Sequence, residues 1–353
     1  MKPAKQKDNR IISAWLFAGV ILVFVQILLG GVTRLTGSGL SITRWEIVTG
    51  AIPPMNQAQW IEAFDLYKAT PQYQKINEGM ELKHFKFIFF WEYIHRLWAR
   101  MMGFIFLIPF LIFWFRKSIS PWLLRRLFVV VLLAALAAVF GWIMVASGLI
   151  DHPWVNAYKL TIHLGLGIAL FIYLFFTWLT YRGYEKTPLQ EKWSRRVQGV
   201  IILALIQIGF GGFMSGMKAA LIYPTWPKMN NSWFPGILMD KKHWNFNTLL
   251  MYEKSGFMPA MIQFIHRNLA YLLALLILLL SYWLVGVLDK RWYWVLFVLV
   301  GIIVVQIGLG ITTLLGSVGS IPVLYASLHQ GLGILFLTYL FYIHKIIQPD
   351  NIK

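Results

Sequence analysis

Eight long apolar stretches constrain the fold of this chain more than any other feature of its sequence. Each is long enough to cross the roughly 30 Å of hydrocarbon in a bilayer. Hydrophobic residues make up 58% of the chain, which exceeds what an ordinary soluble domain carries. The sequence therefore predicts an all-α membrane protein, with helices over residues 11–33, 85–115, 122–147, 159–181, 197–217, 259–286, 292–315 and 322–344.

The basic residues predict how these helices are oriented in the cell membrane. The net charge of +18 does not indicate a nucleic-acid partner, because Lys and Arg are spread over short connectors between the apolar stretches. Basic connectors favour the cytoplasmic side, and an even number of crossings places both termini there. The first stretch lacks a small-residue cleavage pattern, so we expect it to remain as a helix. The longer connections, about 34–84 and 218–258, then lie outside.

Three pairs of similar segments predict an internal duplication. "QILLGGVTR" (26–34) resembles "QIGFGGFMS" (207–215), "EYIHRLWAR" (92–100) resembles "QFIHRNLAY" (263–271), and "HLGLG" (163–167) resembles "HQGLG" (329–333). Four crossings return the chain to its starting side, so the two copies have the same topology. We therefore expect two four-helix bundles related by parallel duplication, residues 1–190 and 191–353.

Four histidines occupy matched positions in the second and fourth predicted helices of each half: His95, His163, His266 and His329. We expect all four toward the outer leaflet. A single histidine within the membrane often only bonds a neighbouring helix, but two at matched depth on facing helices suit the axial ligands of a haem iron. The chain has no cysteine, so thiolate sites are excluded. The remaining histidines have no matched partner and are expected to be surface groups: His84, His152, His243 and His344.

The two halves differ beside these histidines. Glu92 lies three residues before His95, whereas Gln263 holds the equivalent position before His266. A carboxylate at this depth is expected to be paired with Arg96 or Arg100, protonated or catalytic.

Other nearby residues suit a haem pocket. Arg34, Arg96 and Arg267 are candidates to bind haem propionates, since arginine pairs well with carboxylates. Gly165 and Gly167 would let a flat macrocycle or another backbone come close.

The motifs together resemble those of haem A synthases. They are "GGVTRLTGSGLSITRW" with "GAIPP" (50–54), "EYIHR", "GWIMVASGL" (141–149), "HLGLG", "TWPKM", "FIHR" and "SLHQGLG", and they span nearly the whole chain. The resemblance implies an oxidoreductase that oxidises the C8 methyl group of haem O to a formyl group by successive hydroxylation, giving haem A for terminal oxidases. It further implies that His266 and His329 ligate a haem b cofactor, that His95 and His163 flank the substrate haem O, and that Glu92 is the catalytic acid. The chain is similar to the family's cysteine-free branch.

Two other functional classes stay open at this point. A bis-His cytochrome b that only carries electrons would have the same composition and histidine placement, although Glu92 and "TRLTGSGLS" favour the enzyme. A transporter would more typically have broken helices and charges at the midplane. The expected partners are haem O and the lipid bilayer, with haem O synthase and a second copy of the chain as further candidates; the electron partner is not indicated.

Overall fold

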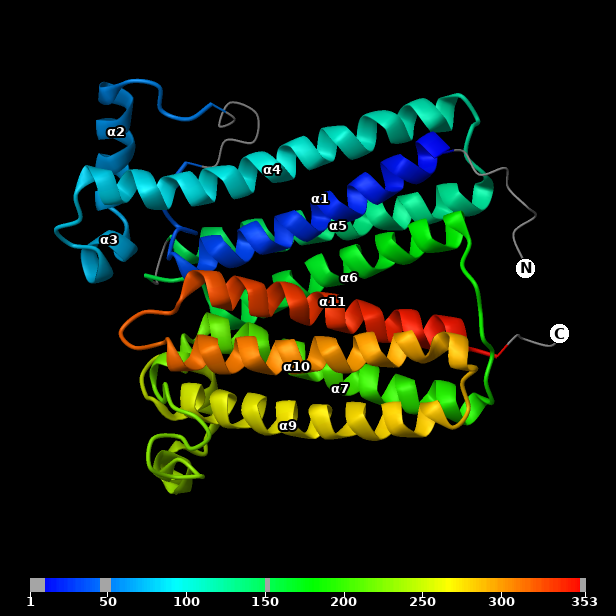
Figure 1. The fold of residues 1–353 in the computed structure, drawn as a ribbon. Helices are drawn as coiled ribbons and strands as arrows, with labels where there is room; N and C mark the ends of the chain where they lie inside the picture. Colours follow the sequence, from blue (N-terminus) through cyan, green and yellow to red (C-terminus); the bar gives the residue numbers. More distant parts are fainter. Residues whose placement is uncertain (1–9, 45–51, 150–152, 350–353) are drawn as a thin grey trace. The chain divides into compact units, whose positions relative to one another are not determined.

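The computed structural model describes residues 10–44, 52–149 and 153–349. Within them every regular element is a helix, apart from an isolated bridge between Met229 and Ser232. Eight helices are long and apolar enough to span a membrane (Figure 1). They are α1 (Arg10–Leu35), α4 (Leu82–Phe115), α5 (Pro121–Gly148), α6 (Ala157–Arg182), α7 (Glu191–Gly216), α9 (Phe257–Val285), α10 (Tyr293–Leu315) and α11 (Val323–Ile347). The predicted all-α membrane fold is confirmed.

Most of the predicted helix ends agree with the structure within a few residues, and the start of α7 differs most. The sequence predicts a start at residue 197, but α7 begins at Glu191. The added turns carry an ion pair between Arg195 and Glu191 at 2.8 Å, and the Arg196 guanidinium lies over the Trp193 ring. Pairs spaced by three or four residues stabilise a solvated helix end, so the charges that suggested a connector belong to the helix.

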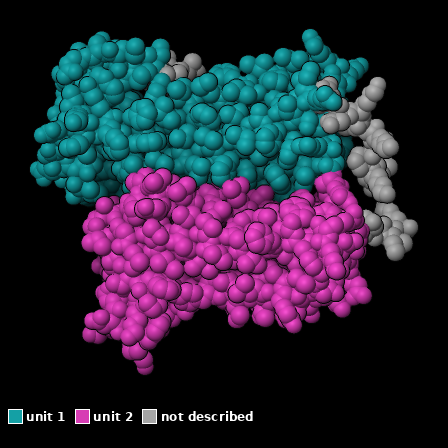
Figure 2. Space-filling view, in the orientation of Figure 1, with its two compact units in different colours: residues 1–183 teal, residues 184–353 magenta. Residues whose placement is uncertain are grey.

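The chain divides into two compact units, residues 1–183 and 184–353 (Figure 2). The division lies at Gly183, close to the expected boundary at residue 190. In unit 1, α1 packs against α4 and α6, and α5 packs against α6. In unit 2, α7 packs against α9 and α11, and α10 packs against the same two helices. Each unit therefore has its own bundle of four long helices.

In unit 1 the long connection after α1 folds into two short helices, α2 (Gln57–Lys68) and α3 (Pro71–Ile76). Both begin at side-chain caps: Asn56 accepts from the backbone of Gln59, and Thr70 accepts from that of Tyr73. They lie beside the first turns of α4 (Figure 1). A core of buried side chains, namely Phe64, Tyr67, Phe85, Ile88 and Phe89, attaches them to α4. We call α2 and α3 the cap of unit 1.

In unit 2 the connection between α7 and α9 contains four short helical segments, η2 (Ala219–Leu221), η3 (Gly236–Met239), η4 (Lys241–His243) and α8 (Phe246–Leu250). A further short turn, η5 (Lys290–Trp292), leads into α10. Both η2 and η3 pack against α9. Each unit therefore places its longest connection at the end of the bundle where its second long helix begins (Figure 1).

Candidate histidine-pair sites

Each of the four histidines packs its ring against a glycine on the preceding long helix. A β-carbon added to these glycines would approach the ring carbon Cε1 to between 2.9 and 3.5 Å. The pairs are Gly30 with His95, Gly141 with His163, Gly211 with His266 and Gly310 with His329. The imidazoles therefore rest on helix backbone, and a side chain at Gly141 or Gly310 would force the ring to move.

Three of the four histidines are also held by a glutamine one helical turn before that glycine. The side-chain amide of Gln26 donates to the backbone carbonyl of His95 at 3.3 Å. Gln207 and Gln306 make the equivalent bonds to the carbonyls of His266 and His329, at 2.9 and 3.0 Å.

The ring orientation of two histidines is fixed by a backbone carbonyl. His163 Nδ1 lies 3.0 Å from the carbonyl oxygen of Ala137, and His329 Nδ1 lies 3.1 Å from that of Gln306. Because a carbonyl only accepts, Nδ1 must carry the hydrogen and Nε2 is an acceptor, which in His329 lies 3.5 Å from the Gln306 amide nitrogen. Metal-binding histidines typically have this arrangement.

The structure brings the predicted partners of unit 2 together. The rings of His266 and His329 have centroids 6.5 Å apart and planes inclined by 75°. In unit 1, α4 with His95 and α6 with His163 both pack against α1. Among the described residues there is no cluster of three or more His, Cys, Asp or Glu that could hold a metal ion. The sites are therefore pairs of imidazoles.

Glu92 is buried and accepts hydrogen bonds from four donor groups. Its Oε2 atom accepts from the backbone N–H of Ser41 at 2.7 Å, from the Ser41 hydroxyl at 2.7 Å and from the N–H of Ile42 at 2.9 Å. Its Oε1 atom accepts from Arg96, which also donates to the Ile42 carbonyl. Only 2% of Glu92 is exposed. Of the arrangements predicted for Glu92, the pairing with Arg96 is the one observed.

The corresponding residues of unit 2 hold a different loop in a similar way. Gln263 donates to the carbonyl of Tyr223 at 2.8 Å. Arg267 donates to the carbonyls of Thr225 and Pro227 at 2.9 and 3.0 Å. In both units, therefore, the residue three before the histidine and the arginine after it attach a loop to the helix.

The other predicted pocket residues differ in their surroundings. Arg34 lies in the last turn of α1. Within the described part of the chain, a β-carbon on Gly165 would meet no atom within 4 Å, whereas one on Gly167 would meet Ile27 at 3.5 Å. Neither glycine is required by tight packing in the protein.

The glutamines and the supporting glycines Gly141 and Gly310 were not predicted as site residues. A signal for them is present in the sequence: Gln-x-x-x-Gly occurs at 26–30, 207–211 and 306–310, and Ala-x-x-x-Gly occurs at 137–141. These four segments lie on the four helices that precede the histidine helices. Residues spaced by four share a helix face, so the repeat could have indicated a common neighbour.

The histidines expected to be surface groups have varied environments. His84 is exposed, and His243 stacks on Phe257 with centroids 5.5 Å apart. His344 is partly buried, and its Nε2 lies 3.1 Å from the Ser194 hydroxyl and 2.9 Å from the Gln198 amide. It is therefore a helix-to-helix contact instead of a surface group. His152 lies outside the described residues.

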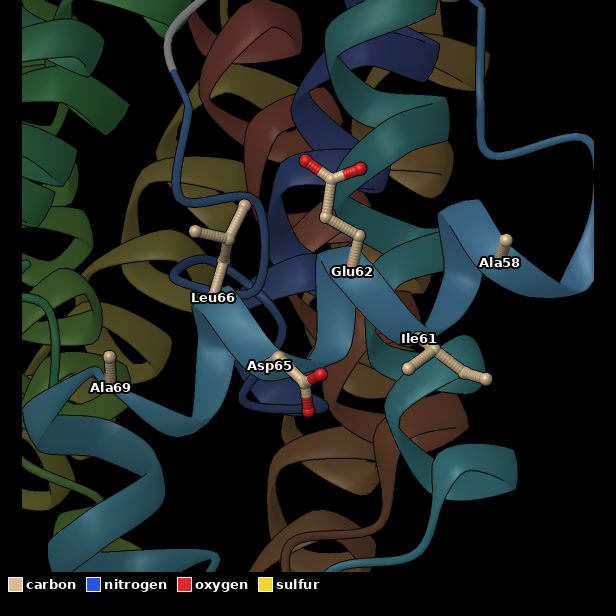
Figure 3. Close-up of a pocket in the computed structure, with 6 residues that line it drawn as sticks. All are labelled: Ala58, Ile61, Glu62, Asp65, Leu66 and Ala69. Carbon is tan, nitrogen blue, oxygen red and sulfur yellow. The ribbon is translucent and has the colours of Figure 1, made fainter.

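A shallow hollow on the surface of the cap contains none of the predicted site residues (Figure 3). It is lined by Ala58, Ile61, Glu62, Asp65, Leu66 and Ala69. Glu62 is paired there with Arg44 at 3.1 Å. None of these lining residues is a histidine, so this hollow is not part of the histidine-pair site.

Comparison with known proteins identifies relatives that match nearly the whole chain. The family model COX15-CtaA, described as cytochrome oxidase assembly protein, matches residues 13–341. The chain is 36% identical over 339 residues to the heme A synthase of Brucella anthropi, covering 95% of this chain and 91% of that protein. It is 37% identical over 330 residues to the heme A synthase of Brucella ovis, covering 92% and 87%.

Proposed function

Because the chain belongs to the family of cytochrome oxidase assembly proteins, we propose that it is a multi-pass membrane haem A synthase, an oxidoreductase that converts haem O to haem A. The observation that carries this proposal is the set of paired, glycine-supported histidines in a chain similar to heme A synthases over most of its length. The reaction oxidises the C8 methyl group of haem O to a formyl group by successive hydroxylation.

The geometry of the pair in unit 2 fits two axial ligands of one haem iron. Metal to imidazole nitrogen bonds are about 2 Å long, and each ring centroid lies about 1 Å beyond its nitrogen, so two rings on opposite sides of one ion have centroids about 6 Å apart. The centroids of His266 and His329 are separated by 6.5 Å. The Nδ1 to carbonyl bond of His329 makes its Nε2 atom an acceptor, and a metal there would replace its 3.5 Å contact with the Gln306 amide.

We assign haem b to the C-terminal half, with His266 and His329 as its ligands, and the substrate haem O to the N-terminal half, with His95 and His163. The support is the difference between the halves, since the buried acid Glu92 has an amide counterpart, Gln263. A bound haem b supplies one-electron chemistry at its iron. The protein supplies ligands, orientation and exclusion of water.

Glu92 is our candidate for the catalytic carboxylate. It lies about one helical turn from His95 and accepts hydrogen bonds from four donors. An ionised carboxylate in a buried site can accept a proton or stabilise positive charge that develops on the substrate. In the same structure it holds residues 41 and 42 against α4, so it also positions the loop beside the substrate site.

Gly165, two residues after His163, leaves space for the macrocycle. The open surroundings of Gly165 leave room for a flat ligand beside the imidazole. Arg34, Arg96 and Arg267 are the candidates for binding propionates. Two nitrogen atoms of Arg267 already bind loop carbonyls, so a propionate there would use its remaining N–H donors.

The direct test is the conversion of haem O by the purified protein. Protein in detergent is supplied with haem O, an electron source and oxygen, and the pigments are extracted and separated by chromatography. Haem A in the extract supports the proposal. A protein that carries a bis-His haem and returns haem O unchanged would instead be an electron-transfer cytochrome b.

A further inference from the structure

In three of the four helix pairs that carry the histidines a glutamine precedes the supporting glycine by four residues, and in the fourth this residue is Ala137. Position 137 corresponds to Gln26, Gln207 and Gln306, because each lies four residues before the glycine that supports a histidine ring. An alanine has no amide to donate. The backbone carbonyl of His163 therefore lacks the side-chain bond that the other three histidines receive from the preceding long helix.

The comparison with His329 shows what this difference removes. His329 is joined to Gln306 three times: its Nδ1 donates to the Gln306 carbonyl, its own carbonyl accepts from the Gln306 amide, and its Nε2 lies 3.5 Å from the same amide nitrogen. His163 keeps the first of these bonds, to the carbonyl of Ala137. The Nδ1 bond fixes only the ring, whereas the bond from the glutamine amide to the histidine carbonyl also fixes the helix backbone that carries the ring.

The helices that precede His163 and His329 also differ in their neighbours. Among the described residues, α10 packs against both α9 and α11, whereas α5 packs extensively against α6 alone. The aromatic contacts between α4 and α5 are those of Phe128 with Phe110 and Trp114, in the first turns of α5 and the last turns of α4. The part of α5 that carries Ala137 is distant in sequence from these contacts.

A glycine follows both histidines by four residues. In unit 2 a β-carbon on Gly333 would lie 3.1 Å from Nε2 of Gln306, so this glycine makes room for the amide. Gly167 holds the same position after His163, and a β-carbon there would meet Ile27 of α1 at 3.5 Å. Position 333 therefore faces the glutamine of the preceding helix, whereas position 167 faces α1.

We infer that Ala137 makes His163 the exchangeable axial ligand, and that a glutamine at the corresponding position 306 fixes the ligand of the resident cofactor. This inference rests on the proposed function. A substrate haem must enter and leave, and a six-coordinate iron must lose one ligand before another molecule can bind it. A ligand whose helix lacks the second bond dissociates more readily. Residue 137 is thus a positioning residue that acts through His163.

Carbon monoxide is a suitable probe, because it binds ferrous haem iron only where an axial position is vacant. We would titrate the reduced full-length protein with carbon monoxide before and after loading with haem O, and record difference spectra. An interhelical hydrogen bond in a membrane changes an equilibrium about threefold on average and at most about eighteenfold. We expect Ala137→Gln to raise the carbon monoxide concentration for half-saturation of the haem O site by a factor in this range.

The reciprocal variant tests the same idea in the other half. Gln306→Ala should make the resident haem b bind carbon monoxide more readily, by a similar factor. Ala138→Gln places an amide on the exposed side of α5, and Gln198→Ala removes the contact with His344, so both serve as matched controls. If Ala137→Gln and Gln306→Ala change carbon monoxide binding no more than these controls, the inference is wrong.

Hydrogen exchange of the haem-free protein gives a readout that does not depend on the reaction. We expect backbone amides near His163 to exchange faster than those near His329, and Ala137→Gln to slow them. Equal exchange at both sites would contradict the inference, even if the wild-type protein makes haem A. Failure of the wild type to convert haem O would contradict the proposed function and leave the exchange difference as expected.

Discussion

The carboxylate of Glu92 and the hydroxyl of Ser41 lie 2.7 Å apart in unit 1. The same carboxylate accepts from two backbone N–H groups of the loop after α1 and from Arg96 on α4. Glu92 therefore connects the loop, the helix and the neighbourhood of His95 through one buried charge. Glu92 therefore has two proposed roles that experiments must distinguish: holding the loop and taking part in the reaction.

Variants of Glu92 and Ser41 distinguish these roles. Loss of a general acid or base typically slows a reaction about 100-fold or more, so we expect Glu92→Gln to lower haem A formation by at least that factor. Ser41→Ala removes one hydrogen bond and keeps the carboxylate, so it should weaken the loop while most activity remains. Haem A is measured by extraction and chromatography. Unchanged formation in Glu92→Gln would remove the residue from the chemistry.

Glycine 310 is expected to be required for retention of haem b. A β-carbon there would lie 2.9 Å from Cε1 of His329, so Gly310→Ala should displace the ring and lower the ratio of haem to protein after purification. Gly308→Ala is the matched control on the same helix, since in the described structure its β-carbon would meet no atom within 4 Å. Equal haem content in the two variants would show that the ring position does not matter.

The cap of unit 1 should loosen at alkaline pH. Tyr67 is fully buried, donates to Gln72 at 3.0 Å and accepts from Asn77 at 2.6 Å. Burial raises the pKa of Tyr67 above its ordinary value of 10.0. In the unfolded cap Tyr67 loses its proton at a lower pH than in the folded cap. The contribution of Tyr67 to the stability of the cap is therefore complete below about pH 10 and falls as the pH rises toward the pKa of the folded form.

Limited proteolysis of the cap as a function of pH measures this effect. We expect cleavage within residues 52–81 to increase above pH 10. In Tyr67→Phe the cap should be weaker at neutral pH, because two hydrogen bonds are lost, but cleavage should increase less between pH 10 and 12. A steep increase that is the same in both proteins would assign the pH dependence to another group.

Arg267 is predicted to hold the loop around Thr225 and Pro227. Its two bonds to these carbonyls use the planar guanidinium, whose fork a lysine cannot reproduce. We expect Arg267→Lys to increase hydrogen exchange in residues 223–232. Asn268→Ala is the control, because its amide donates to Phe264 on its own helix. Equal exchange in the two variants would contradict the assigned role.

The fold was largely predictable because each membrane helix is marked by its own run of apolar residues. The eight spans depend on length and composition, which are local properties. The start of α7 was missed because the charged residues around Arg195 resemble a connector, although they pair along a helix. The arrangement of the cap depends on contacts such as Gln72 with the Gly37 carbonyl, which join distant parts of the chain and leave no local pattern.

The candidate site was predictable in part. The positions of the histidines and Glu92 follow from how rarely ionisable groups occur within membrane helices. The glutamines were missed because an amide in a membrane helix has many possible partners, and its bond to a histidine carbonyl requires knowledge of which helices are neighbours. The pairing of Glu92 with the Ser41 and Ile42 backbone was also hidden, since backbone donors do not appear in a residue pattern.

The most direct test of the account is the optical and electron paramagnetic resonance spectrum of purified histidine variants. The central claim is that each pair of imidazoles binds one haem iron, with haem b between His266 and His329. We predict a low-spin bis-His spectrum in the wild type that is retained in His95→Ala and His163→Ala and lost in His266→Ala and His329→Ala. An intact low-spin haem b spectrum in His266→Ala or His329→Ala would contradict it.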